Sequence, residues 1–157
     1  MMLHKLYMLT ALGFGSGKIP KAPGTFGTLA AVIPVILTSA SPYWVKAIVF
    51  FIMLVLGTAA SQYHGTYTGL KDASEVVIDE IAAYYMIFLF FPVNTFTLVM
   101  GFILFRIFDI LKPYPIKNFE KLDGGVGVMM DDIIAGFYTI ICLAIVYFAY
   151  IMFFAHK

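Results

Sequence analysis

Four long stretches without a charged residue limit what this chain can fold into. They cover Ala22–Val45, Ala47–Leu70, Ile81–Phe105 and Ile133–His156, and each holds 24 or 25 residues. A helix that crosses a bilayer needs about 20 predominantly apolar residues. The stretches therefore predict an integral membrane protein that folds as an all-α, polytopic helical bundle.

Composition supports the same class. The 157 residues are 62% hydrophobic and 12% charged, whereas roughly 25% of the residues of an ordinary soluble domain are charged. No polar linker is long enough to separate two units, so we expect one domain over residues 1–157. A net charge of +1 without a dense basic tract argues against a nucleic-acid partner and leaves the lipid bilayer as the expected one.

Local signals place the first two helices. Proline and glycine residues argue against a helix before Thr25. One helix is expected from Thr25 or Thr28 to Thr38, with Pro34 as a candidate kink. A second is expected over Tyr43–Gln62, after a short turn.

The third apolar stretch allows two interpretations. As one span, Ile81–Phe105 would place the charged segments on either side of it in different compartments. As a short helical hairpin that turns at Phe91–Thr95, it would place them in the same compartment. Pro92 and Asn94 form turns readily and suit a lipid-facing helix poorly, which favours the hairpin.

The distribution of charge agrees with the hairpin. All nine acidic residues then share one face, and eight basic residues lie on that face against two on the other. This is the bias of a cytoplasmic face. The eight are Lys5, Lys18, Lys21, Lys71, Arg106, Lys112, Lys117 and Lys121, and the two are Lys46 and Lys157.

A helix is expected to begin near Ser74, with Ser74 or Asp72 as its N-cap. On this helix Asp72, Glu75 and Asp79 would share one stripe, because they are spaced i, i+3 and i+7. Taken singly, such acids are also explained by the favourable dipole of a helix N-terminus.

Two pairs of adjacent acids carry more information. Asp79–Glu80 and Asp131–Asp132 each come just before an apolar helix, so one acid of each pair should face protein or lipid. Facing each other, the pairs would offer four carboxylates, an all-oxygen site suited to Mg²⁺ or Mn²⁺. No histidine is expected near them, since the three in the chain are scattered: His4, His64 and His156.

Two further segments suit an anion. Arg106 and Lys112 flank Asp109 at i−3 and i+3, which indicates either a surface ion pair or a grip on phosphate. The segment 13–28, GFGSGKIPKAPGTFGT, is rich in glycine and opens a helix, where backbone N–H groups bind anions. It lacks the spacing of a P-loop, and alone it is weak evidence.

Together, these segments resemble the phosphatidylglycerophosphatase A family of bacterial membrane phosphatases. The matching pieces, in the order of the family, are GFGSGKIPKAPGTFGTLAA (13–31), KDASEVVIDEIAAYY (71–85), FRIFDILKPYPI (105–116) and GGVGVMMDDIIAG (124–136). One departure is visible. The family places a glycine soon after the Asp–Glu pair, where this chain has Ala82 and Ala83.

The resemblance implies Mg²⁺-dependent removal of the terminal phosphate of phosphatidylglycerophosphate, at the cytoplasmic face of the bacterial inner membrane. The family's acidic pairs correspond to metal ligands at Asp79, Glu80, Asp131 and Asp132. Its substrate-binding segments correspond to Gly24, Thr25, Gly27, Thr28, Arg106 and Lys112.

The chemistry of the residues fits direct attack by water. Phosphoryl transfer requires charge neutralisation and a positioned water, which carboxylate-bound metal supplies. We count Asp79 and Asp132 as catalytic through the metal, and Asp109 as the general base or the residue that holds the water. The rival from another class is a divalent-cation or proton-coupled transporter that uses the same acids.

Overall fold

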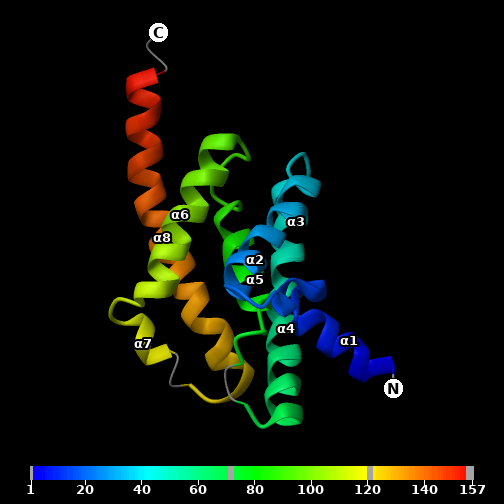
Figure 1. The fold of residues 1–157 in the computed structure, drawn as a ribbon. Coiled ribbons are helices and arrows are strands. Elements are labelled where there is room, and N and C mark those ends of the chain that lie inside the picture. Colours follow the sequence, from blue (N-terminus) through cyan, green and yellow to red (C-terminus); the bar gives the residue numbers. More distant parts are fainter. Residues whose placement is uncertain (1, 71–72, 120–121, 155–157) are drawn as a thin grey trace.

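All regular secondary structure in the described residues is helical, with no strand among them. The structure is a computed structural model and describes residues 2–70, 73–119 and 122–154. The all-α expectation is confirmed. The elements are α1 (Met2–Ala11), the 3₁₀ segment η1 (Gly13–Lys18), α2 (Pro23–Ala30), α3 (Val32–Leu37), α4 (Tyr43–Thr68), α5 (Ile78–Ile87), α6 (Thr95–Leu111), α7 (Ile116–Phe119) and α8 (Gly124–Phe154) (Figure 1).

Two of these helices are long and apolar enough to cross a bilayer. They are α4, with a mean hydropathy of 2.0, and α8, with 2.2 over Gly124–Phe153. The two pack against each other, and both contact α5. Large apolar side chains such as Phe51 and Phe148 remain exposed on their outer faces. Such surfaces suit contact with lipid.

The third apolar stretch is a hairpin, as the turn formers predicted, and the single-span interpretation is wrong. α5 ends at Ile87 and α6 begins at Thr95. Asn94 caps α6 by accepting a hydrogen bond from the Thr97 N–H (2.9 Å), and the Thr97 hydroxyl donates to the Pro92 carbonyl (2.6 Å). The side chains of the turn therefore satisfy backbone groups that a lipid-facing break would leave unpaired.

The helix α5 forms the centre of the molecule, between α4, α6 and α8 (Figure 1). Every residue of α5 except Glu80 is buried. Ala82 and Ala83 are fully buried, so the core has room for both methyl groups where the family has a glycine. The small residue at this contact is Gly136 of α8, whose added Cβ would lie 3.2 Å from the Ala83 carbonyl oxygen.

Two helix starts differ from the expectation. A helix was not expected before Thr25, yet α1 occupies Met2–Ala11, and Pro23 begins α2 because proline is tolerated in a first turn. The predicted start near Ser74 is also wrong, since α5 begins at Ile78 after a non-helical segment. Asp72, the other proposed N-cap, lies outside the described residues, as do Lys71, Glu120, Lys121, His156 and Lys157.

The second acidic pair does not precede its helix. α8 begins at Gly124, so Asp131 and Asp132 lie two turns inside it. Its early glycines allow close packing, because a Cβ on Gly125 would overlap the Thr58 carbonyl oxygen of α4. Close contact between backbones therefore offsets the low helix propensity of glycine.

The Asn94 cap yields a prediction. Asn94→Ala removes the oxygen that accepts from Thr97 and should lower the free energy of unfolding by about 1 kcal/mol. Thermal unfolding in detergent measures this as a lower midpoint. Asn94→Asp keeps the acceptor and should unfold near the wild-type temperature. Equal midpoints for Asn94→Ala and the wild type would show that the cap does not hold the hairpin.

Candidate functional site

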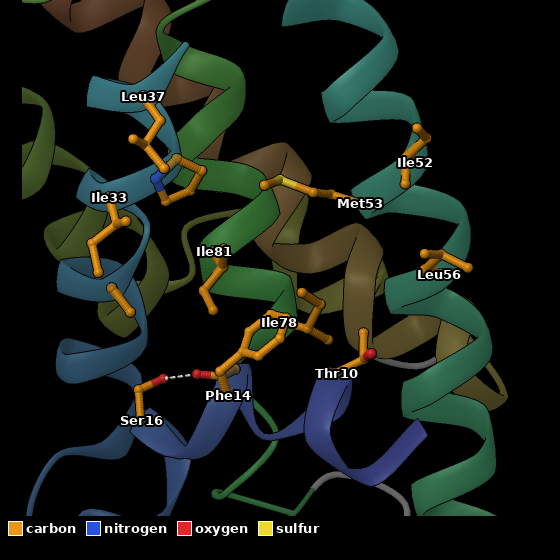
Figure 2. A pocket seen from close by; sticks show the side chains of 13 residues that line it. Thr10, Phe14, Ser16, Ile33, Leu37, Ile52, Met53, Leu56, Ile78 and Ile81 are labelled. Carbon is orange, nitrogen blue, oxygen red and sulfur yellow. Dashed lines mark hydrogen bonds between the residues drawn. The ribbon is translucent and has the colours of Figure 1, made fainter. Parts of the chain in front are cut away.

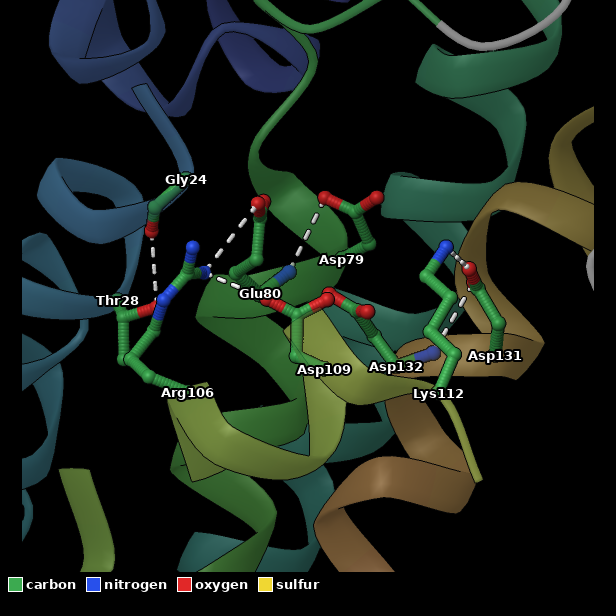
Figure 3. A network of polar contacts seen from close by, with 9 residues as sticks. All are labelled: Gly24, Thr28, Asp79, Glu80, Arg106, Asp109, Lys112, Asp131 and Asp132. Atoms are coloured by element: carbon green, nitrogen blue, oxygen red, sulfur yellow. Dashed lines mark hydrogen bonds and ion pairs between the residues drawn. The ribbon is translucent and has the colours of Figure 1, made fainter. Parts of the chain in front are cut away.

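Three helices bring acidic and basic side chains to one place near the middle of the molecule. The first turn of α5 carries Asp79 and Glu80, while the second and third turns of α8 carry Asp131 and Asp132. The last turn of α6 supplies Asp109. Figure 3 shows these side chains gathered in one region, with Asp131 turned toward Lys112. The expected convergence of the two acidic pairs is therefore present.

A subset of three acids is close enough to share an ion. Asp79, Glu80 and Asp132 each offer a carboxylate oxygen, and the three oxygens lie within 4.8 Å of one another. Asp79 and Asp132 are buried, and Glu80 is partly buried. The fold thus brings three of the four predicted ligands together, and that they bind a metal stays a prediction.

The basic side chains divide between different acids. Arg106 Nη1 lies 2.6 Å from Asp109 Oδ2 and 3.8 Å from Glu80 Oε1. Lys112 Nζ donates to Asp131 Oδ2 across 2.6 Å. The spacing of Lys112 and Asp109 indicated either an ion pair between them or a contact with phosphate. In the structure, Lys112 instead contacts Asp131 of α8. That Asp131 binds a metal stays a prediction.

The electrostatics of the three acids favour a bound cation. Burial, followed by the neighbouring Asp132 charge, raises the pKa of Glu80 to about 8. Burial and the adjacent Glu80 carboxylate raise the pKa of Asp79 well above its usual range. Glu80 Oε2 and Asp132 Oδ2 are buried and accept no hydrogen bond from any described residue. Because a divalent cation would compensate both the desolvation and the repulsion, these residues fit Mg²⁺ or Mn²⁺.

The acids open onto a cavity of about 280 Å³, called here the acidic cavity. Its wall includes the start of α2 and the segment before α5. The lining residues are Ala22, Pro23, Gly24, Ala73, Ser74, Val76, Asp79, Glu80, Arg106, Asp109, Ile110, Lys112, Asp131 and Asp132.

The glycine-rich segment contributes less to this cavity than expected. Gly24 lines it, whereas Thr25, Gly27 and Thr28 are not among the lining residues. The buried Thr28 hydroxyl donates to the Gly24 carbonyl (2.9 Å; Figure 3). Gly27 is explained by packing, because its Cβ would lie 2.6 Å from Val77 Cβ. Substrate binding by Thr25, Gly27 and Thr28 stays a prediction.

Comparison with known proteins agrees with this arrangement of motifs. A family model described as phosphatidylglycerophosphatase A matches residues 9–147. The chain belongs to the phosphatidylglycerophosphatase A family. All four motif segments of the resemblance lie inside the matched range, and they contribute every lining residue of the acidic cavity.

Three curated relatives cover most of the chain. A phosphatidylglycerophosphatase A of Haemophilus influenzae is 38% identical over 89% of this chain and 87% of its own length. A phosphatidylglycerophosphatase A of Escherichia coli is 36% identical over 89% of this chain and 81% of its own length. A putative phosphatidylinositol-3-phosphatase of Bacteroides thetaiotaomicron is 38% identical over 89% of this chain and 92% of its own length. No solved structure matches the chain.

Glu75 lies apart from the acidic cavity. Glu75 was expected on a stripe with Asp79, but residues 74–77 are not helical, so no stripe forms. Instead Glu75 Oε1 lies 3.0 Å from Nε2 of the fully buried His64. Although the three histidines are scattered in the sequence, the fold brings His64 beside Glu75, which belongs to neither acidic pair. His64 does not line the acidic cavity.

The segment that precedes α5 belongs to the motif 71–85, but none of its residues before Asp79 was predicted to bind metal or substrate. Ala73, Ser74 and Val76 line the cavity, and Ser74 was assigned only as a helix cap. A long-range contact places this segment, since the Val77 N–H donates to the Ala11 carbonyl at the end of α1 (2.9 Å).

A second, apolar cavity lies on another face of α5 (Figure 2). It has a volume of about 610 Å³ and is called here the apolar groove. Ile78 and Ile81 of α5 form part of its wall, with Ile33 and Leu37 of α3 and Leu56 of α4. Hydroxyl groups on its wall come from Thr10 and Ser16.

The position of Gly24 allows a test in which the substitution, Gly24→Ala, changes no charge. A Cβ at Gly24 would overlap Glu80 Oε1 and lie 3.0 Å from Arg106 Nη1. Gly24→Ala should therefore displace the Glu80 carboxylate. A bound ion raises the unfolding temperature, and Gly24→Ala should lose most of the rise that Mg²⁺ produces in the wild type.

The matched control is Gly101→Ala in α6, where an added Cβ meets its nearest atom at an ordinary 3.7 Å. It should keep the full response to Mg²⁺. An undiminished response in Gly24→Ala would show that Glu80 does not contribute to ion binding.

Proposed function

We propose that the chain hydrolyses the terminal phosphomonoester of phosphatidylglycerophosphate to phosphatidylglycerol and inorganic phosphate, with Mg²⁺ as cofactor and Mn²⁺ as a substitute. The observation that carries the proposal is the group of Asp79, Glu80 and Asp132, in which two buried carboxylate oxygens accept no hydrogen bond from any described residue. Family membership supplies the substrate class, because two of the relatives are named for this lipid.

Asp79, Glu80 and Asp132 would hold the ion, and Asp131 is the fourth candidate ligand. The ion would supply positive charge at the phosphoryl group, where negative charge accumulates during transfer. Without it, the three carboxylates would repel a phosphate dianion.

The basic side chains bind and orient the phosphate. Arg106 is held by Asp109, yet its Nε is buried and donates no hydrogen bond to any described residue. A planar guanidinium donates two parallel hydrogen bonds to phosphate oxygens. Lys112 adds a second positive charge at the rim, and the N-terminus of α2 at Gly24 favours an anion through its helix dipole.

Asp109 holds the attacking water and accepts its proton. The water oxygen forms the new bond to phosphorus, the bond from phosphorus to the glycerol oxygen breaks, and that oxygen takes up a proton. The Arg106 ion pair fixes the Asp109 carboxylate beside the three metal-binding acids. Direct attack by water needs no nucleophilic cysteine or histidine, and neither type lines the acidic cavity.

Placement in a membrane completes the proposal. The whole chain, residues 1–157, acts as one polytopic domain, in which α4 and α8 cross the bilayer and the hairpin of α5 and α6 inserts from one side. The bias of basic residues supports a position of the acidic cavity at the cytoplasmic face of the inner membrane. The apolar groove has a size and lining suited to an acyl chain of the lipid.

The test is phosphate release by purified protein in detergent micelles that contain phosphatidylglycerophosphate. Release should stop with EDTA, return with Mg²⁺ or Mn²⁺, and need no ion gradient. Asp79→Asn should reduce release by at least about a hundredfold, the scale of a lost electrostatic contact to the transition state. Wild-type rates in EDTA would exclude the metal mechanism.

Two controls sharpen this result. Glu75→Gln changes an acid outside the acidic cavity and should keep wild-type activity. Phosphatidylinositol 3-phosphate, the substrate class in the name of the Bacteroides relative, is supplied in parallel. Faster release from it would replace the proposed substrate, and no release from either lipid would favour the transporter.

A further inference from the structure

We propose that α1, together with Phe14, is an anchor that lies in the plane of an anionic leaflet, at the boundary between headgroups and acyl chains. The inference rests on the proposed function only in that the chain must reside in a membrane. It assigns a lipid-binding surface to a part of the molecule that contributes no residue to the acidic cavity.

The outer face of α1 is apolar and exposed. Met2, Leu3, Leu6 and Leu9 are exposed, and Leu6 has 57% of its surface accessible. Phe14 follows α1 at the mouth of the apolar groove, and 78% of its surface is accessible. Clustered apolar side chains on one face of a short helix are typical of helices that insert their apolar side into a membrane interface.

Positive charges accompany this surface. A cavity of about 620 Å³ lies between α1 and η1. Its cations, Lys5 and Lys18, are exposed, while Met8, Leu9 and Leu12 give it an apolar wall. Glu75 also lines it, and it is paired with His64. Lysines beside apolar side chains match an anionic phospholipid, whose phosphate lies directly above its hydrocarbon.

The inner face of α1 fixes its depth. Tyr7 stacks on Tyr63 of α4 with a centroid distance of 4.9 Å, and His4 packs against Tyr67 at 4.7 Å. At this level α4 changes from an apolar sequence to the polar run 61–68, SQYHGTYT. Tyrosines gather where a spanning helix enters water. The aromatic contacts therefore place α1 at that boundary.

The anchor is joined directly to the catalytic helix. The Ala11 carbonyl at the end of α1 accepts a hydrogen bond from Val77, the residue before α5. Asp79 follows two residues later. A helix fixed at headgroup depth thus holds the acids at the depth where the phosphate of a lipid is found.

Tryptophan fluorescence in proteoliposomes tests the proposal without any assay of activity. Trp44, the single tryptophan of the chain, is first replaced by phenylalanine. Leu6→Trp then reports on α1, Phe51→Trp on the exposed apolar face of α4, and Thr66→Trp on its polar end. The vesicles contain phosphatidylcholine and phosphatidylglycerol, with or without chains brominated near the headgroup.

The tryptophan at position 6 should be quenched by the brominated lipid. Its quenching by aqueous acrylamide should be severalfold weaker than that of the tryptophan at position 66. Lys5→Gln with Lys18→Gln should reduce the quenching by brominated phosphatidylglycerol and leave that by brominated phosphatidylcholine in place. A tryptophan at position 6 that is quenched by acrylamide as strongly as the one at position 66 would overturn the anchor.

The tryptophan at position 51 distinguishes a wrong assignment of α1 from a wrong placement of the whole chain in the membrane. If position 51 is shielded from acrylamide while position 6 is not, the chain lies in the membrane and α1 is not an anchor. If both are open to acrylamide, the membrane placement fails as well. Circular dichroism of each variant verifies that the helices are retained.

Discussion

Repulsion between buried carboxylates is the constraint on which the rest of this structure depends. Asp79, Glu80 and Asp132 lie within ligand distance of one another, and burial disfavours the charge of each. The nearby cations do not compensate all of it, because Arg106 is closest to Asp109 and Lys112 to Asp131. The divalent cation proposed here would compensate the remaining charge and, at the same time, provide the positive centre that phosphoryl transfer needs. Under this proposal, stability and catalysis require the same ion.

The architecture follows from placing these acids at the edge of an apolar body. α5 has only ten residues, all but Glu80 buried, and its first turn carries two of the three acids. A single spanning helix would place its two ends on opposite sides of the bilayer. In the hairpin, the chain turns back after α5, so the N-terminus of α5 and the C-terminus of α6 lie side by side. α8 supplies the third acid from two turns inside a long helix. The acidic cavity thus lies where one short and two longer helices meet.

Much of this could be predicted from local chemistry. Pro92 and Asn94 in the middle of an apolar stretch indicated the hairpin, and paired acids beside apolar runs indicated the cluster. The start of α5 was misplaced because Ser74 resembles an N-cap, whereas a hydrogen bond from Val77 to Ala11 keeps this segment non-helical. The start of α8 was missed because Gly124 and Gly125 argue against a helix, and only contact with α4 explains them. The partner of Lys112 was also missed, since Asp131 is 19 residues away in the sequence and only the packing of the helices brings the two together.

Direct measurement of ion binding tests the central claim. Mn²⁺ titrated into the purified protein in detergent, with free Mn²⁺ followed by electron paramagnetic resonance, should bind saturably to the wild type and compete with Mg²⁺. Asp132→Asn should weaken this binding by more than about tenfold, since loss of even an outer contact to a metal site costs that much. Equal Mn²⁺ affinity in the wild type and Asp132→Asn would show that the three buried carboxylates do not form a metal site.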